Sequence, residues 1–322
     1  MLNLLRSDAK LFETVDLAAQ AADWRVPDDA VWIDLQSPSR EEELAVESAL
    51  GVELPTPEDM IQIEPSSRLY QEDGATYMTA SLLTHGDAPH QSLNPVTFVL
   101  TGQKLVTLRY VAPRAFEVFA QRVSQPGPNL QVGGEILLGL LDAVVERLAE
   151  ALEHGSEQVQ NSSNAIFDRP RGGAFEPLLT SLALTQSITS MARTSLVSLG
   201  RLASFAALAA EVKEHKDCRE HLVSVQHDIQ SLTEHSGYQA SHISFLLDAA
   251  LGLINIEQNS TMKFFAVATV LLMPPTLVGA IYGMNFDHMP ELHWAYGYPL
   301  ALLLMLASGL IPFFWFRRKG WF

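Results

Sequence analysis

Two long runs without a charged residue lie close together near the end of the chain. They cover residues 264–286 and 294–316. At about 1.5 Å per residue in an α-helix, each run can cross a hydrocarbon layer about 30 Å thick. No water satisfies backbone polar groups inside such a layer, so two neighbouring runs are predicted to form a helical hairpin. The sequence therefore predicts a protein of the lipid bilayer with two C-terminal transmembrane helices.

Basic residues flank this hairpin and are absent from its loop. Lys263 precedes the first run, residues 317–319 read Arg-Arg-Lys after the second, and residues 287–293 hold no Lys or Arg. Cytoplasmic loops carry an excess of basic residues. We therefore expect a multi-pass protein of the cell inner (cytoplasmic) membrane, with both termini cytoplasmic and the loop outside. The opening residues contain no apolar run, so no signal peptide is expected.

The rest of the chain is acidic. The net charge at pH 7 is −16, and outside residues 1–263 only Asp287, Glu291 and the basic tail are charged. Nucleic acid is not expected as a partner, because neutralising its phosphates requires clustered Lys and Arg. A negatively charged body instead attracts cations. The single cysteine, Cys218, excludes an intrachain disulfide and fits a reducing compartment.

Residues 1–125 carry strand signals and are predicted to form a cytoplasmic mixed α/β domain. Short apolar runs predict strands at 31–35 and 76–84. A hairpin is expected from 96 to 110, with its turn at 101–103. These strands imply a sheet in this part of the chain.

The sequence also predicts two helix starts in this domain. Ser39 precedes three glutamates at 41–43, which favour a helix N-terminus, and Gly51 predicts the end of that helix. Thr56 and Pro57 predict a second start, as N-cap and first helical residue. The domain is thus expected to alternate strands and helices.

A segment rich in Pro and Gly at 125–129 separates this domain from a helical region. Residues 126–262 are predicted to form long cytoplasmic helices arranged as a funnel or stalk. These helices are expected at 134–167, at 175 to about 211, and from about 213 without a strong breaker before Pro274. Residues 263–322 form the transmembrane hairpin and its tail. The fold class is therefore an α+β membrane protein.

Positions seven residues apart in the last long helix form an unusual stripe. One series is Glu234, Ser241, Asp248, Asn255, Met262, Thr269, Thr276 and Gly283, and its companion is Tyr238, Phe245, Gly252, Asn259, Ala266, Met273 and Ala280. A coiled coil would be apolar throughout at these positions. Scattered surface positions are the simpler interpretation outside the membrane. Inside it, polar residues on one stripe predict a water-lined axis shared by several subunits, because two spans cannot enclose a path.

The motifs at this end of the chain resemble the CorA family of divalent-cation channels. They are Gly283-Met284-Asn285 after Tyr282, Met289-Pro290-Glu291-Leu292 in the loop, Ile254-Asn255-Ile256-Glu257-Gln258-Asn259, and the Pro274-Pro275-Thr276 step. The likeness covers the C-terminal quarter with specific motifs, whereas the preceding residues resemble the family only in layout. It implies a homopentamer.

The resemblance implies that Gly283, Met284 and Asn285 form a selectivity filter in which Asn285 faces the metal ion. Mg²⁺ loses water reluctantly and prefers octahedral oxygen ligation. A ring of Asn285 carbonyl oxygens would accept hydrogen bonds from the hydrated ion, whereas a charged ring would bind it too tightly. Gly283 is expected to let the backbone leave the helix. The simpler interpretation is a glycine helix end followed by an Asn in a turn.

Two acidic residues lie outside this filter. Asp287 and Glu291 are expected to form an outer-loop ring of negative charge that concentrates cations. For Asp287, solvation of a short loop explains the residue equally well.

Seven residues on the preceding helix are candidates for the pore and its gate, and we refer to them as the axial stripe. They are Asp248, Asn255, Asn259, Met262, Thr269, Met273 and Thr276. Met262 and Met273 are expected to form apolar constrictions that close by dewetting, with core packing as the alternative. Pro274 and Pro275 remove helix hydrogen bonds and are expected to bend or loosen the span.

Histidines form a further series beside this stripe. His221, His235 and His242 lie seven or fourteen residues apart, and Cys218 precedes them. These ligands suit Zn²⁺, Co²⁺ or Ni²⁺, although exposed positions on a long helix are the simpler interpretation. An acidic face comprises Glu146, Glu150, Glu153 and Glu157. The resemblance implies that cytoplasmic acidic residues bind regulatory Mg²⁺ between subunits, without assigning them to named positions.

The residues and the resemblance together predict a homopentameric channel for Mg²⁺ influx, with Co²⁺ and Ni²⁺ as secondary ions and intracellular Mg²⁺ as regulator. No bond chemistry is expected, so the protein is not predicted to be an enzyme. A zinc transporter of the same superfamily is one alternative, disfavoured because that branch tends to carry Ile in place of Met284. A non-transporting membrane sensor or scaffold is the other. The polar stripe argues against it, because a simple anchor does not need polar residues.

Overall fold

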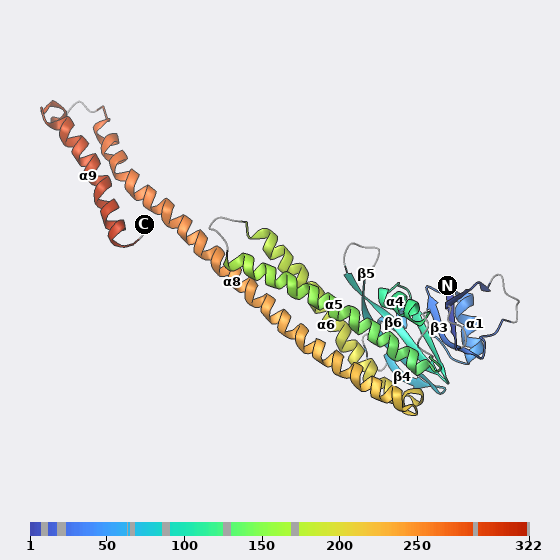
Figure 1. Ribbon diagram of the computed structural model, residues 1–322. Coiled ribbons are helices and arrows are strands. Elements are labelled where there is room, and N and C mark those ends of the chain that lie inside the picture. Colours follow the sequence, from blue (N-terminus) through green and yellow to red (C-terminus); the bar gives the residue numbers. More distant parts are fainter. Residues whose placement is uncertain are drawn as a thin grey trace. The chain divides into compact units, whose positions relative to one another are not determined.

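The computed structural model describes residues 1–7, 12–17, 24–62, 64, 68–85, 91–124, 130–168, 174–285 and 289–320. The chain forms two compact units. The first comprises Met1–Phe167 and Pro177–Leu246, and the second comprises Asp168–Glu176 and Leu247–Phe322. One helix, α8, continues from the first unit into the second (Figure 1).

A mixed seven-stranded sheet organises the first unit. Its strands are β1 (Leu2–Arg6), β2 (Phe12–Val15), β3 (Ala30–Gln36), β4 (Leu69–Glu72), β5 (Ala75–His85), β6 (Gln91–Thr101) and β7 (Lys104–Arg109). They are ordered β2-β1-β3-β7-β6-β5-β4. β3 and β7 pair in parallel, and the other neighbours pair antiparallel. The expected strands at 31–35 and 76–84 and the hairpin are confirmed as β3, β5 and β6–β7.

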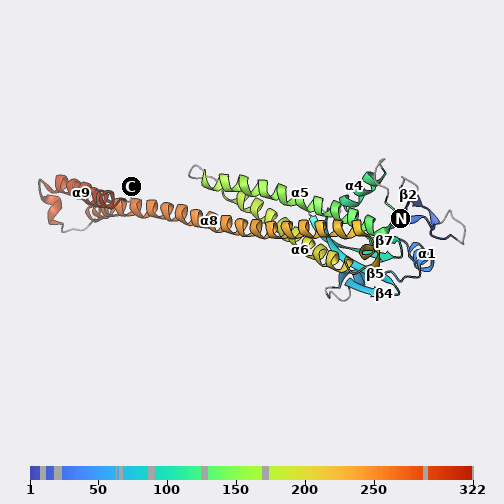
Figure 2. The ribbon, with the colours of Figure 1, turned by 60° about the horizontal axis from the view of Figure 1, so that its bottom comes forward.

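The described helices include three that exceed thirty residues. The described helices are α1 (Arg40–Leu50), α2 (Pro57–Ile61), α4 (Arg114–Val123), α5 (Gly133–Phe167), α6 (Glu176–Ala206), α7 (Ala210–Lys213), α8 (Lys216–Tyr282) and α9 (Gly297–Arg318), with a 3₁₀ turn η2 at Pro290–His293. Figure 2 shows α5 and α6 extending beside the first part of α8. The long helices expected from the sequence are therefore present.

Local helix signals act as predicted. Ser39 and Glu42 form a reciprocal capping box at the start of α1, which ends at Gly51 with a left-handed backbone, φ 68°. Thr56 and Asp59 form the same arrangement at α2, with Pro57 in the first turn. Both motifs satisfy backbone groups that a helix end leaves without partners.

The predicted helix at 175 to about 211 is wrong near its end. α6 stops at Ala206, and a tight turn leads to α7 at Ala210. The turn is closed by backbone hydrogen bonds from Leu208 to Phe205, 2.9 Å, and from Ala209 to Ala206, 3.1 Å. Ala209 and Val212 are fully buried, so packing rather than a helix-breaking residue ends α6. The segment rich in Pro and Gly at 125–129 lies outside the described residues.

Both faces of the sheet are buried, each against a different set of helices. Trp32, Phe98 and Leu105 belong to a core shared with α4, α5, α6 and the first part of α8. The next residues along the strands, including Ile33 and Val99, belong to the core beneath α1 and α2. This alternation follows from the two-residue period of a strand. Burial on both faces explains why the sequences of these strands are continuous apolar runs.

A buried ion pair crosses the parallel strand pair. Arg109 donates hydrogen bonds to the Asp34 carboxylate from Nε (2.9 Å) and Nη2 (2.8 Å), and the two side chains are only 6% and 1% exposed. Thr107 Oγ1 donates to the same carboxylate at 2.8 Å, and Trp32 Nε1 donates to Thr107 at 3.0 Å. These four side chains lie on one face of the sheet, the face that carries Trp32, and strand pairing sets Asp34 opposite Thr107.

In the second unit, α8 and α9 have the length and composition needed to cross a membrane. Only 6% and 11% of their most apolar 18-residue windows are buried. Core helices of soluble proteins are mostly buried, so these helices expose apolar surface that water would disfavour. Lys319 lies over the Trp315 ring, 4.4 Å from its centroid, in the basic end of α9. Such an arrangement is typical of a membrane interface.

We expect Asp34→Ala to lower the free energy of unfolding of the first unit by about 3–5 kcal/mol, because it leaves Arg109 buried without its partner. The matched control, Glu13→Gln, breaks the exposed Arg6–Glu13 pair, whose N–O distance is 3.7 Å, and should cost about 0–1 kcal/mol. Thermal unfolding of the purified full-length protein, followed by tryptophan fluorescence, measures both. Equal losses would contradict the role of the buried pair.

We also expect Gly133→Ala to destabilise the start of α5 by about 1–3 kcal/mol. A Cβ at Gly133 would lie 2.4 Å from the Lys104 carbonyl carbon and 2.5 Å from the Leu105 amide nitrogen, so the backbone would have to move. Gly237→Ala is the control, because its nearest neighbours, atoms of Arg193, are 3.9 Å away. The same unfolding measurement should show a lower melting temperature only for the Gly133 variant.

Candidate functional site

The axial stripe lies entirely on the part of α8 that belongs to the second unit. All seven of its residues are exposed in the single chain, namely Asp248, Asn255, Asn259, Met262, Thr269, Met273 and Thr276. The helical period brings them onto one broad face. The chain therefore presents the stripe without covering it.

The second span packs against a different face of α8. A Cβ added at Gly309 of α9 would lie 3.6 Å from both the Leu271 carbonyl oxygen and Pro275, and one added at Gly279 would lie 3.1 Å from Met305. These small residues let the two helices approach closely. At about 100° per residue, the three stripe residues of the span lie about 100–160° around α8 from Pro275. The stripe thus lies outside the face of α8 that contacts α9.

Sequence reasoning missed the glycine contacts between the two spans. Gly279 and Gly309 were available as small residues within apolar runs, which is a known signal for close helix packing. α8 remains helical through Pro274 and Pro275. The Leu271 carbonyl, which loses its usual partner because Pro275 has no N–H, lies beside Gly309. Gly309 therefore lies at the point where the prolines interrupt the hydrogen bonding of α8.

The threonines of the stripe bond to their own helix. Thr269 Oγ1 donates to the Phe265 carbonyl at 2.8 Å, and Thr276 Oγ1 donates to the Leu272 carbonyl at 2.7 Å. Each hydroxyl oxygen therefore keeps lone pairs that can accept a hydrogen bond from outside the helix. Internal bonding also makes a threonine tolerable next to lipid. The position of each threonine on the stripe is therefore stronger evidence for a pore than the polarity of its side chain.

The expected filter lies where α8 ends. The helix closes at Tyr282, and Gly283 still donates a backbone hydrogen bond to Gly279, 3.0 Å. Gly283 does not take a positive φ, so the backbone leaves the helix after it, where Met284 donates to Ile281 at 3.3 Å. A Cβ at Gly283 would lie 3.1 Å from the Gly279 oxygen. A left-handed backbone is therefore not the reason for glycine at this position.

Asn285 follows this helix end and is exposed. Its amide can therefore reach an ion or a neighbouring chain at the end of the stripe. Asp287 lies outside the described residues, and Glu291 lies in the 3₁₀ turn η2. The outer ring of negative charge stays a prediction.

The histidine series faces α5 in the first unit. His221 Nε2 lies 2.5 Å from Asp142 Oδ2, and His235 Nε2 lies 3.3 Å from Ser156 Oγ. Among the described residues, no group of three or more His, Cys, Asp or Glu side chains could hold a metal ion. Within this part of one chain, the histidines serve helix contacts and do not assemble the zinc site considered above.

The acidic face of α5 is partly neutralised. Glu146 accepts a hydrogen bond from Arg122 at 3.1 Å, and Glu150 pairs with Arg147. Burial raises the pKa of Cys218, so its thiol is less readily ionised for metal binding. These contacts do not identify a regulatory ion site.

Comparison with known proteins places this geometry in a family. The model of the family described as CorA-like Mg²⁺ transporter protein matches residues 27–318. The chain is 33% identical over 295 residues to the magnesium transport protein CorA of Salmonella typhimurium and 34% identical to that of Escherichia coli K12. Each alignment covers 91% of this chain and 92% of the relative.

Solved structures share the fold. The CorA magnesium transporter of Methanocaldococcus jannaschii matches with a TM-score of 0.78 and 17% identity, covering 100% of this chain and 98% of that one. The full-length CmaX protein matches with a TM-score of 0.71 and 16% identity, covering 99% and 97%. The proteins of this family are transporters or channels, not enzymes, and the chain belongs to the CorA-like Mg²⁺ transporter family.

Proposed function

We propose that this protein forms a homopentameric channel through which Mg²⁺ enters the cytoplasm, with Co²⁺ and Ni²⁺ as secondary ions. The observation that carries the proposal is the exposed axial stripe, which lies outside the face that contacts α9 and leads to Asn285. The identity of the chain to magnesium transport proteins supports Mg²⁺ as the main ion.

Assembly follows from the number of spans. Two helices per chain cannot surround a water-filled path, so α8 from several copies must supply its wall. A ring with the axial stripe facing inward would remove Thr269 and Thr276 from lipid and place them beside water. In that ring, α9 would lie on the lipid side of α8.

Ion selection in this proposal depends on an uncharged ring. Mg²⁺ keeps much of its hydration shell, and the carbonyl oxygens of Asn285 would accept hydrogen bonds from its bound water. Met262 and Met273 would form apolar constrictions that exclude water when narrow. A negative interior potential favours entry of a divalent ion by about 4.6 kcal/mol per 100 mV.

The same proposal fixes orientation and regulation. The basic residues 317–319 and Lys263 would face the cytoplasm, so both termini would lie on the cytoplasmic side of the cell inner membrane. Asp287 and Glu291 would then concentrate cations at the outer mouth. Intracellular Mg²⁺ bound between cytoplasmic units would favour the closed state, and its loss would shift the population toward the open state.

We expect Asn285→Ala to abolish Mg²⁺ flux while leaving the oligomer intact, because it removes the acceptors for the hydrated ion. Asn164→Ala is the matched control, since Asn164 is an exposed residue of α5 that bonds Gln160. Flux into proteoliposomes under a negative-inside potential measures transport, and size-exclusion chromatography measures assembly. Wild-type flux in the Asn285 variant would refute the proposed filter.

The same vesicles distinguish the alternative functions of the wild-type protein. Voltage-driven Mg²⁺ entry that is indifferent to a pH gradient supports the channel. Zn²⁺ movement that requires a proton gradient supports the zinc transporter, and no flux of Mg²⁺, Co²⁺, Ni²⁺ or Zn²⁺ supports the sensor or scaffold.

We further expect Met273→Ala to raise Mg²⁺ flux severalfold when cytoplasmic Mg²⁺ is high, because a wider constriction dewets less readily. Leu272→Ala is a close control, since both side chains are 68% exposed in the single chain but lie about 100° apart around α8. The same flux assay measures both variants. Equal changes would show that Met273 has no special place on the stripe.

A further inference from the structure

Four basic side chains lie at the end of the hairpin that is opposite to its loop. They are Lys263 of α8 and Arg317, Arg318 and Lys319 at the end of α9; all four are exposed, and we call them the basic collar. The Trp315 side chain is 53% exposed, and its ring lies under the Lys319 ammonium. A lysine over an indole ring at the edge of an apolar run keeps its charge at the boundary between hydrocarbon and water.

The two parts of the basic collar lie at the same level of the hairpin. Gly309 of α9 lies against Leu271, and an earlier residue of α9 lies against Gly279, so the two helices run antiparallel. Lys263 precedes Leu271 by eight residues, and Arg317 follows Gly309 by eight residues, which is about 12 Å along each helix. The positive charges therefore gather at one end of the second unit.

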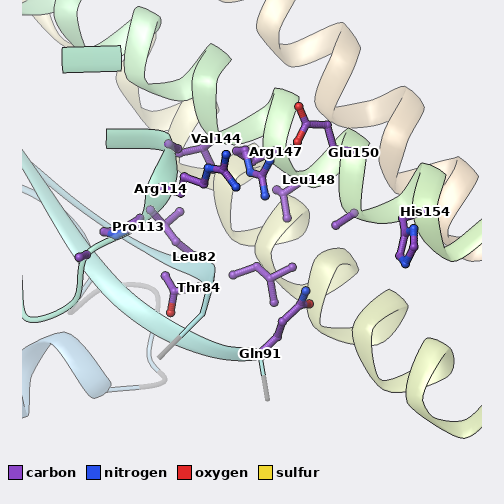
Figure 3. A pocket seen from close by; sticks show the side chains of 14 residues that line it. Leu82, Thr84, Gln91, Pro113, Arg114, Val144, Arg147, Leu148, Glu150 and His154 are labelled. Atoms are coloured by element: carbon purple, nitrogen blue, oxygen red, sulfur yellow. Dashed lines mark hydrogen bonds and ion pairs between the residues drawn. The ribbon is translucent and has the colours of Figure 1, made fainter. Parts of the chain in front are cut away.

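Acidic residues of the hairpin do not neutralise the basic collar. Residues 258–286 and 292–322 contain no Asp or Glu. Among the described residues, none of the four collar side chains takes part in an ion pair. In the first unit, by contrast, Arg147 pairs with Glu150 beside the cavity drawn in Figure 3.

The helix dipole neutralises only part of this charge. The C-terminus of a helix carries about half a negative elementary charge, whereas three full positive charges lie at the end of α9. The basic collar therefore keeps a net positive charge that an anion from outside the chain can neutralise.

The arrangement of the collar fits a layer of anions better than a single bound ion. Successive residues of a helix lie about 100° apart, so Arg317, Arg318 and Lys319 spread around the end of α9. Side chains that diverge in this way do not enclose one phosphate, but each can meet a different phosphate in a plane of headgroups. The apolar surface of both spans is mostly exposed and continues from the collar toward the hydrocarbon that underlies such headgroups.

We propose that the basic collar is a docking surface for the headgroup phosphates of anionic phospholipids. The four basic side chains bind the phosphates, and the Trp315 ring holds Lys319 at the level of the headgroups. This surface requires only that both spans lie in a bilayer, as in a membrane transporter of this family. It is independent of the proposed ion path and of the number of subunits.

Native mass spectrometry of the purified full-length protein, incubated with equal amounts of phosphatidylglycerol and phosphatidylcholine, tests this surface. We expect the wild type to retain phosphatidylglycerol in preference to phosphatidylcholine. Each basic residue beside an anionic headgroup layer contributes about fivefold in affinity, so removing three of them should lower the preference at least tenfold. The variant combines Arg317→Gln, Arg318→Gln and Lys319→Gln.

The matched control loses the same number of positive charges elsewhere. It combines Lys213→Gln, Lys216→Gln and Arg219→Gln, which change three exposed residues around the start of α8 in the first unit. This part of the chain is outside the apolar runs, so the lipid preference should equal that of the wild type.

A charge-retaining variant separates lipid binding from damage to the hairpin. Arg317→Lys combined with Arg318→Lys keeps the positive charge and should keep the preference for phosphatidylglycerol. Inorganic phosphate at millimolar concentration should not displace the lipid, because the collar does not enclose a single anion. Equal retention of both lipids by the wild type, an unchanged preference in the triple Gln variant of the collar, an equal loss in the control or in the Lys variant, or displacement by phosphate would overturn the proposal.

Discussion

The structure depends on one helix whose backbone hydrogen bonds are satisfied both in water and in hydrocarbon. α8 covers Lys216–Tyr282, and its internal hydrogen bonds make it suitable both for a protein core in water and for hydrocarbon. A strand or loop could not cross between these environments without leaving polar groups unpaired. The chain can therefore pass from water into hydrocarbon within a single helix. Only the side chains on its faces have to change.

Those side chains change in step with their surroundings. In the first unit, Cys218, Leu222, Val225 and Ile229 of α8 join the core beneath the sheet. In the second unit, contacts near Pro275 bring α8 against α9, and the remaining faces stay exposed. The helix thus contributes to a soluble core at one end and presents a polar stripe at the other. In an assembly of several copies, this stripe would line the shared path.

The proposed ion site depends on neutral groups. Asn285 would offer uncharged oxygen acceptors at the end of a span, which suits a cation that must bind weakly and leave. The net charge of the whole protein is −16, so the site is defined by the groups at the helix end rather than by that charge.

The sequence by itself determined the features that depend on neighbouring residues. The two spans, the capping boxes at Ser39 and Thr56, the hairpin and the spacing of the axial stripe all follow from local pattern, and family motifs around Asn285 identified the class of protein. Tertiary structure decided what depends on distant partners. It places β1 between β2 and β3, pairs β3 with β7 in parallel and ends α6 at Ala206. Sequence pattern records which face of an element is apolar, whereas the partner that covers that face is chosen only when the whole chain packs.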